Sequence, residues 1–167
     1  MEKQGLPAYS TPSIRPVDDD FTWQEHSTQP GHTSAPRVLV AEDDPALRHL
    51  MVYLLAFEGY FVTEASNAQA MLDAVRASDG NSKLGFDLIV TDVRMPGLSG
   101  LDALARLRET GCQVPAIVVS ALPGEMVRPE AEELNALFLP KPFALENLRR
   151  IANRVVQSNQ SRCLDIL

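Results

Sequence analysis

The stretch that decides the fold is VLVAEDDP, residues 38–45. It begins with four apolar residues and changes abruptly to three acidic residues and a proline. A short continuous apolar run is typical of a strand that is buried on both faces of a sheet. Asp44 and Pro45 are favoured as the N-cap and first residue of a helix. The stretch therefore predicts a buried strand whose carboxyl end leads directly into a helix.

The residues after Pro45 have the pattern of an amphipathic helix that ends at Gly59. Its apolar side chains recur at the spacing of one helix face: Leu47, Leu50, Met51, Leu54 and Leu55. Further strands are expected over residues 60–64, 86–91, 114–119 and 137–139, and helices over 67–77, 100–109, 126–134 and 144–157. Apolar strands that alternate with helices predict an α/β fold: a doubly wound sheet of five parallel strands with helices on both faces.

The ends of the chain differ in composition from this region. Residues 1–35 are polar, contain prolines and show neither the helical nor the strand spacing of apolar residues. This composition is typical of a disordered or loosely docked extension. The run 18–20 is acidic and precedes Phe21 and Trp23, which fits either a solvated tail or a short binding motif. We expect one domain over residues 36–157 and a frayed tail over 158–167.

Charge and composition limit the classes of partner and the cellular compartment that we expect for this chain. The net charge of −7 argues against a nucleic-acid binder, which should carry a basic patch. Cys112 and Cys163 are far apart and form no CxxC pair, so we expect two reduced thiols. No stretch approaches the roughly 20 apolar residues of a membrane span, and the N-terminus lacks an apolar signal core. We therefore expect a cytoplasmic protein without a nucleic-acid or membrane partner.

Polar residues stand where the expected strands end. The first strand is followed by Glu42 and Asp43, the third by Asp92, the fourth by Ser120 and the fifth by Lys141. Ligands of a doubly wound sheet bind beyond the carboxyl ends of its strands. Each residue taken alone has an ordinary explanation as a helix cap, a loop residue or a surface lysine. Their common position at strand ends instead indicates one site.

This set of residues suits phosphoryl chemistry. Crowded carboxylates repel one another, and a hard cation such as Mg²⁺ or Mn²⁺ relieves the repulsion. A carboxylate can also act as a nucleophile and form an acyl phosphate. Lys141 would neutralise charge on the transferring phosphoryl oxygens, and Ser120 offers them a hydroxyl donor.

The motifs VLVAEDDP (residues 38–45), DLIVTDVRMPG (87–97), Ser120-Ala121 and KPF (141–143) resemble those of one family. They are similar to the receiver domains of bacterial response regulators, which act in two-component signalling, and the resemblance covers about residues 36–157. It implies the flavodoxin-like (βα)5 receiver fold, here as a stand-alone domain.

The resemblance also implies roles around the metal. Asp92 resembles the phosphoacceptor and Asp43 a direct Mg²⁺ ligand. Glu42 resembles the second acidic residue, which acts through water. The backbone carbonyl of Arg94 would be a further metal ligand.

Other matching positions concern the phosphate and the switch. Lys141 resembles the lysine that pairs with the phosphate, and the peptide bond before Pro142 is similar to one that is cis in the family. Ser120 and Phe138 resemble the hydroxyl and aromatic switch positions.

The segment between Ser120 and Phe138 departs from the family pattern. Pro123, Gly124 and Pro129 are expected to interrupt a normally more regular fourth helix. Asn135 stands where the family often has Gly, and Asn tolerates the left-handed conformation that such a turn requires.

Two neighbours of the site resemble positions that tune loss of the phosphoryl group. Arg94 could pair with the phosphoryl group or point into solvent. Leu122 is apolar and would not hold an attacking water, which predicts a slowly decaying phospho-form.

The leading hypothesis is a phosphorylation-controlled binding switch or relay. Its partners would be a histidine kinase or histidine phosphotransfer protein and a downstream protein target, with a weak or phosphorylation-dependent homodimer as a further alternative. A second hypothesis is a phosphorylation-independent scaffold with the same fold. A third is an aspartyl-phosphate hydrolase, but such enzymes usually place a second acid where this chain has Arg94. We expect no enzyme activity beyond self-phosphorylation and self-dephosphorylation.

Overall fold

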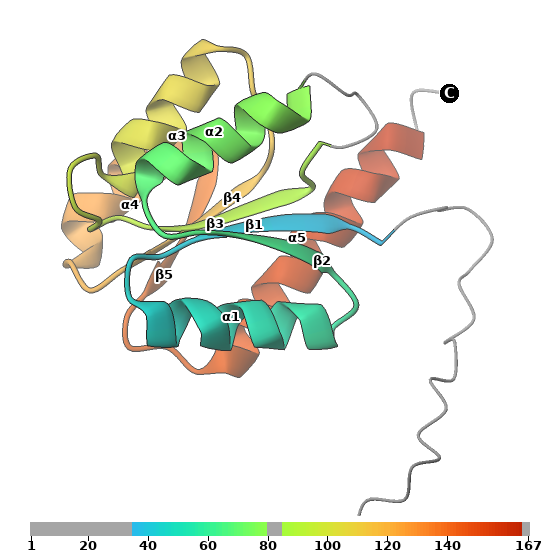
Figure 1. Cartoon of the computed structure of the whole chain (residues 1–167), viewed down its shortest axis with the longest axis horizontal. Helices are drawn as coiled ribbons and strands as arrows, with labels where there is room; N and C mark the ends of the chain where they lie inside the picture. Colours follow the sequence, from blue (N-terminus) through green and yellow to red (C-terminus); the bar gives the residue numbers. More distant parts are fainter. Residues whose placement is uncertain (1–34, 80–84, 165–167) are drawn as a thin grey trace, which may run out of the picture. The chain divides into compact units, whose positions relative to one another are not determined.

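A computed structural model describes residues 35–79 and 85–164 of the chain (Figure 1). The predicted N-terminal extension, its motif at residues 18–23 and most of the polar loop before residue 85 lie outside the described residues. So does the side chain of Cys163, whereas Cys112 is a free thiol.

The described residues form five parallel strands and five helices that alternate along the chain. The strands are β1 (Arg37–Ala41), β2 (Phe61–Ala65), β3 (Leu88–Asp92), β4 (Ala116–Ser120) and β5 (Ala136–Pro140). The helices are α1 (Pro45–Phe57), α2 (Ala68–Asp79), α3 (Gly100–Glu109), α4 (Gly124–Glu133) and α5 (Leu145–Leu164). The sheet order is β2-β1-β3-β4-β5. The predicted fold class is therefore confirmed.

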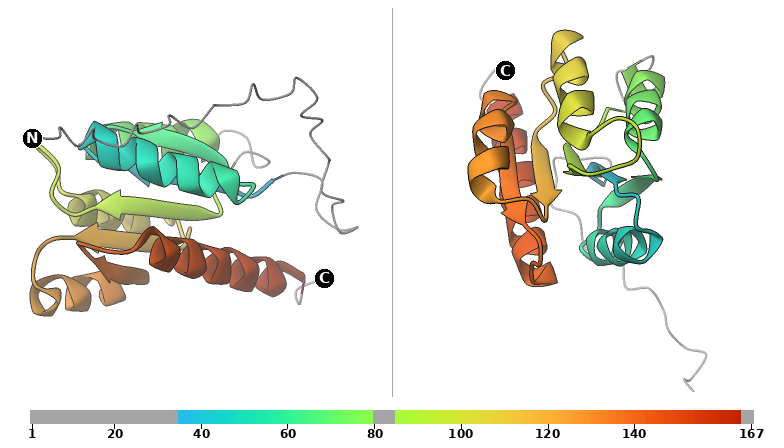
Figure 2. Two further views of the ribbon diagram at one scale, coloured as in Figure 1. Left: turned by 90° about the horizontal axis from the view of Figure 1, so that it is seen from below. Right: turned by 90° about the vertical axis from the view of Figure 1, so that its left-hand side faces the viewer.

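Each face of the sheet carries its own apolar core. Alternate residues of a strand point to opposite faces, so Val38 and Val40 of β1 pack against α1 and α5, whereas Leu39 and Ala41 pack against the layer of α2, α3 and α4. In Figure 1 the two helical layers lie on opposite sides of the sheet. Helices α1 and α5 lie next to each other on their face (Figure 2). Strands β3 and β4 are buried along their whole length, as continuous apolar runs predict.

The predicted cap at Asp44 is confirmed, and Asn67 caps the start of α2. The side chain of Asp44 accepts hydrogen bonds from the backbone N–H groups of Ala46 and Leu47, at 2.8 and 3.2 Å. The side chain of Asn67 accepts one from Ala70 N–H at 2.8 Å. Each cap satisfies N–H groups that have no partner within the helix.

The expected interruption of the fourth helix is wrong. Helix α4 is continuous although Pro129 lies inside it. Pro123 precedes the helix, where its missing N–H is tolerated, whereas Pro129 removes the hydrogen bond that position 129 would donate and crowds the carbonyl one turn earlier. Val127 and Ala131, one turn apart, bury one face of α4 and hold it on the sheet. The left-handed conformation expected at Asn135 is confirmed, with φ of 52°.

The expected end of the last helix is also wrong, because α5 continues past residue 157 to Leu164. The segment 158–164 contains neither proline nor glycine, the two residues that most strongly end helices. Its polarity favoured a tail, but polarity alone does not stop a helix.

Gly100 allows α3 to start against the end of β3. Its N–H donates to the carbonyl of Val93 at 3.0 Å, so the loop after Asp92 closes tightly. A Cβ added at Gly100 would overlap the Asp92 carbonyl oxygen and lie 2.6 Å from Thr91 Oγ1. Backbone atoms cannot move away cheaply, so only glycine fits here.

We expect Gly100→Ala to lower the free energy of unfolding by about 1–3 kcal/mol, the usual cost of overpacking a tight interior. Thermal or urea unfolding measures the loss. Gly85→Ala is the matched control, because a Cβ at Gly85 would meet no atom within 4 Å. Equal stability of the two variants would contradict the role given to Gly100.

Candidate functional site

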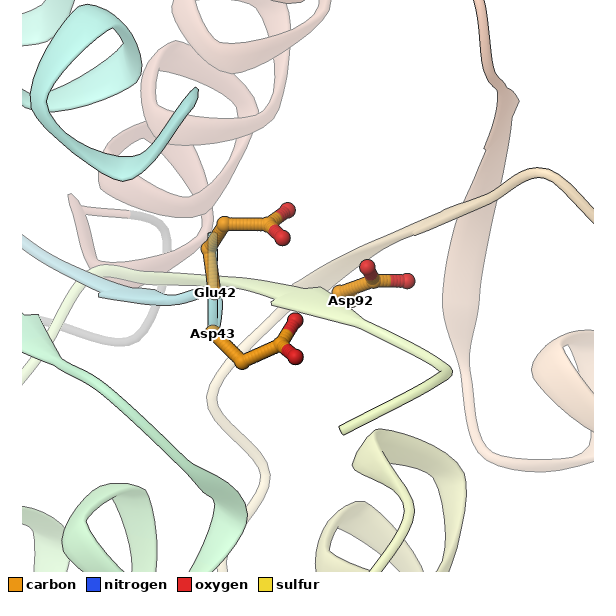
Figure 3. Close-up of side chains that lie close together, drawn as sticks. All are labelled: Glu42, Asp43 and Asp92. Carbon is orange, nitrogen blue, oxygen red and sulfur yellow. The ribbon is translucent and has the colours of Figure 1, made fainter. Parts of the chain in front are cut away.

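Three carboxylates meet at the carboxyl ends of two neighbouring strands. Glu42 and Asp43 follow β1 directly, and Asp92 is the last residue of β3, which pairs with β1. Each of the three side chains offers an oxygen atom, and these atoms lie within 4.8 Å of one another (Figure 3). Glu42 and Asp92 are buried, whereas Asp43 is exposed. The arrangement has the size and the oxygen chemistry of a divalent-cation site that is open on one side.

The backbone holds Glu42 in its buried position. Its N–H donates to the carbonyl of Ala65 at 3.1 Å, so β1 remains tied to β2 beyond its last ladder residue. Its carboxylate accepts a hydrogen bond from Asp44 N–H at 3.3 Å. The side chain is only 1% exposed. A buried carboxylate of this kind needs a cation nearby.

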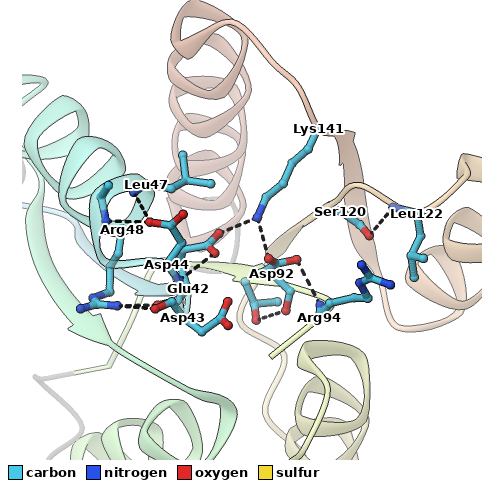
Figure 4. A network of polar contacts seen from close by, with 12 residues as sticks. Glu42, Asp43, Asp44, Leu47, Arg48, Asp92, Arg94, Ser120, Leu122 and Lys141 are labelled. Atoms are coloured by element: carbon cyan, nitrogen blue, oxygen red, sulfur yellow. Dashed lines mark hydrogen bonds and ion pairs between the residues drawn. The ribbon is translucent and has the colours of Figure 1, made fainter. Parts of the chain in front are cut away.

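Lys141 supplies that cation. It follows β5, and its N–H donates to the carbonyl of Ser120 at 2.7 Å. Its Nζ lies 2.7 Å from Glu42 Oε2 and 2.6 Å from Asp92 Oδ2, so one ammonium bridges two carboxylates (Figure 4). The Lys141–Pro142 peptide bond is cis, as the resemblance implies.

The site shifts the protonation of Glu42 and Lys141. Burial raises the pKa of Glu42, the negative charge of Asp92 adds to this, and the hydrogen bond from Lys141 only partly offsets both. Burial alone would lower the pKa of Lys141, but its hydrogen bonds to Asp92 and Glu42 outweigh this, and the pKa is raised. Lys141 is therefore firmly charged. With all groups ionised, three carboxylates and one ammonium leave a local charge of −2, which favours a divalent cation.

The loop after β3 closes over Asp92. Arg94 N–H donates to Asp92 Oδ1 at 3.1 Å, and Val93 N–H donates to the carbonyl of Val119 at 3.0 Å. Asp92 thus has one oxygen on Lys141 and the other on the loop backbone, and it is 6% exposed. The backbone of Arg94 thus contacts the Asp92 carboxylate through its N–H, and the carbonyl of Arg94 stays a predicted metal ligand. The side chain of Arg94 is exposed.

The two expected switch residues lie apart from this cluster. The buried hydroxyl of Ser120 accepts a hydrogen bond from Leu122 N–H at 3.0 Å, and among the described residues none joins it to Asp92 (Figure 4). Phe138 is half-buried on β5 under α4. The Arg128 guanidinium carbon lies 5.4 Å from its ring centre, and a Cβ added at Gly124 would lie 3.1 Å from the ring.

Arg48 was not among the predicted site residues, and it contacts the acidic segment, residues 42–44, from α1. Its Nη1 donates to the backbone carbonyls of Glu42, at 2.7 Å, and Asp43, at 3.4 Å. Its Nε lies 3.2 Å from Glu64 Oε2 at the end of β2. The signal was the presence of a cation in the first turn of a helix, where the dipole disfavours it.

Comparisons with known proteins agree with this geometry. Residues 38–153 match the family model of the response regulator receiver domain. Response regulator MprA of Mycolicibacterium vanbaalenii is 40% identical over 113 residues, which cover 67% of this chain and 46% of MprA. DNA-binding transcriptional regulator NtrC of Rhizobium meliloti is 36% identical over 126 residues, which cover 75% of this chain and 25% of NtrC. The chain thus spans less than half the length of these relatives.

A solved structure has the same fold. The receiver domain of the Francisella response regulator 1452 superposes with a TM-score of 0.67 at 27% identity, and the match covers 74% of this chain and 98% of that domain. No helix of the described residues is long and apolar enough to cross a membrane. The family model, the sheet order and the cluster of carboxylates lead to one assignment: this chain belongs to the response regulator receiver domain family.

Proposed function

We propose that this receiver domain is a phosphorylation-controlled switch in which Asp92 accepts a phosphoryl group. Receiver domains are signalling domains of two-component systems, and aspartate phosphorylation and Mg²⁺ binding are general features of the family. The observation that supports the proposal is the bridge of Lys141 between Asp92 and Glu42, inside a cluster of three carboxylates. The phosphoryl donor is a histidine kinase or a histidine phosphotransfer protein.

The residues fit a bound Mg²⁺ or Mn²⁺ ion. Asp43 and Asp92 would bind the ion directly, and Glu42 would bind it through water. The backbone carbonyl of Arg94 would be the last ligand that the protein supplies. Hard divalent cations of this size favour a few carboxylates together with waters and phosphate oxygens. When bound, the ion neutralises charge on the transferring phosphoryl group.

In the transfer itself, Asp92 is the only nucleophile that the proposal requires. The P–N bond of a phosphohistidine breaks, a P–O bond forms to the Asp92 carboxylate, and the donor imidazole takes up a proton. Lys141 stays charged, because its pKa is raised, and it can move its contact from the carboxylate to the new phosphoryl oxygens. The loop N–H of Arg94, already on Asp92, fixes the direction of the carboxylate.

Ser120 and Phe138 form the switch in this proposal. The Ser120 hydroxyl leaves Leu122 N–H and donates to a phosphoryl oxygen, and the Phe138 ring moves toward the space that is vacated. A charge change at Asp92 thereby biases two states of the α4–β5 surface, which a downstream protein reads. Residues 36–157 are the receiver domain in this proposal, and 1–35 and 158–167 are its extensions.

The wider role of the protein is also a proposal. We infer a cytoplasmic protein whose signal leaves through a protein partner. NtrC, which binds DNA, extends far beyond the matched region, so the expectation that this chain has no nucleic-acid partner stays a prediction. The scaffold alternative depended on a disrupted fourth helix, and the continuity of α4 weakens it.

We expect the wild-type chain to gain the mass of one phosphoryl group when it is incubated with acetyl phosphate and Mg²⁺. Asp92→Asn should gain none, because the amide is not a nucleophile, and a chelator should suppress the gain in wild type. Intact-mass spectrometry measures all three. Absence of any gain in wild type would refute the proposed function and favour the scaffold.

Glu42→Gln should stabilise the metal-free protein at neutral pH. The folded-state pKa of Glu42 is raised, so its ionisation destabilises the folded protein as the pH rises from 4.5 through that pKa. Glutamine carries no such charge. The difference in unfolding temperature, measured in a chelator, should therefore vanish below pH 4.5 and grow toward neutral pH. A difference that is independent of pH would contradict this account.

The phospho-form should decay slowly. Leu122 lies next to the Ser120 hydroxyl, is only partly exposed and offers no polar side-chain group to an attacking water. Loss of the phosphoryl mass from purified protein with Mg²⁺ gives the rate. Leu122→Asn, which adds a polar group, should decay faster, and rapid loss in wild type would defeat the prediction.

A further inference from the structure

Arg48 occupies an unfavourable place for a cation. It is the fourth residue of α1, and the N-terminus of a helix carries partial positive charge. Its side chain is nevertheless 13% exposed, so it is largely withdrawn from water. A cation in such a position requires hydrogen-bond acceptors nearby. The acceptors of Arg48 identify the part of the chain that its side chain restrains.

The acceptors of Arg48 lie mainly on the acidic segment of the site. Nη1 donates to the carbonyls of Glu42 and Asp43, at 2.7 and 3.4 Å. On the other side Nε donates to the Glu64 carboxylate at 3.2 Å, which fixes the guanidinium in its plane. Figure 4 shows the side chain of Arg48 reaching back along the segment that carries both acidic residues.

These contacts restrain the segment where it has few other restraints. Glu42 is tied to Ala65 through its N–H, and Asp44 is tied to α1 by its capping bonds. Asp43 lies between them with an exposed side chain, and its proposed role is direct metal binding. A guanidinium that holds the carbonyls of residues 42 and 43 limits rotation of the peptide from which the Asp43 side chain projects.

We propose that Arg48 is a positioning residue for the divalent cation: it holds the backbone of Glu42 and Asp43 so that their carboxylates are preorganised around the metal. Its guanidinium does not touch the ion in this role. The inference rests on the proposed function only in that the carboxylate cluster binds Mg²⁺. Partners that orient metal ligands typically change metal affinity by about 10–100-fold when they are removed.

Electrostatics alone and the positioning role predict opposite changes in the affinity for Mg²⁺ when Arg48 is removed. Removal of a positive charge beside a cation site should, by electrostatics alone, tighten Mg²⁺ binding. The positioning role predicts the reverse for Arg48→Ala: a Kd for Mg²⁺ raised about 10-fold or more. Arg48→Lys keeps the charge but loses the planar guanidinium group, which contacts the two backbone carbonyls and the Glu64 carboxylate at once. Its Kd for Mg²⁺ should therefore also rise, but by less than that of Arg48→Ala.

Isothermal titration of the full chain with MgCl₂ measures these constants, and thermal unfolding in a chelator measures stability separately. Arg76→Ala is the control, since it removes the same charge from an exposed pair on α2, with Arg76 63% exposed, and should leave the Kd unchanged. A merely structural role would lower the unfolding temperature of Arg48→Ala and leave its Kd near that of wild type.

Unchanged or tighter Mg²⁺ binding by Arg48→Ala would overturn the inference and leave the proposed function standing. If Arg48→Ala does not fold, the Lys variant decides, and a wild-type Kd there overturns the inference equally. Absence of Mg²⁺ binding by wild type would instead overturn the proposed function, and the inference with it.

Discussion

The structure depends on the contact of one ammonium group with two buried carboxylates. Glu42 and Asp92 end neighbouring strands, so the parallel sheet forces their charges together, and Lys141 reaches both from the end of β5. Burial of uncompensated carboxylates would be costly. The strand order, the close turn at Gly100 and the cap at Asp44 all serve to bring these groups to one edge. The remaining negative charge makes this edge a place for a cation.

The surface around this edge divides into two regions with different properties. On the side of β1, the acidic segment is tied by Ala65, by the cap of α1 and by Arg48. On the side of β4 and β5, the Ser120 hydroxyl accepts a hydrogen bond from Leu122 N–H, and Phe138 lies under α4 beside Arg128. The first region suits the binding of an ion with fixed geometry. The second holds Ser120 and Phe138, the two side chains that change partners in the proposed switch.

Much of this could be predicted from the sequence, because the information is local. Apolar runs predict where the five strands lie, although not their exact ends, and Asp44 predicts the start of α1 through bonds to nearby N–H groups. Arg48 could not be predicted in its role, since its acceptors are backbone carbonyls and a glutamate on β2 that only the folded chain brings near. Likewise, the continuity of α4 through Pro129 comes from tertiary burial of Val127 and Ala131, which outweighs the local preference. Helix α5 is longer than predicted because its polar last residues contain neither proline nor glycine.

The crowding at Gly100 has an evolutionary consequence. A Cβ added at Gly100 would collide with the main chain of Asp92 and with the Thr91 hydroxyl. The Asp92 carboxylate is not among the atoms nearest to it. A descendant that lost the proposed acceptor, through Asp92→Asn for example, would still be under selection to keep this glycine. The fold itself therefore requires Gly100, and we expect this glycine to be retained even in relatives that no longer carry out the phosphoryl chemistry.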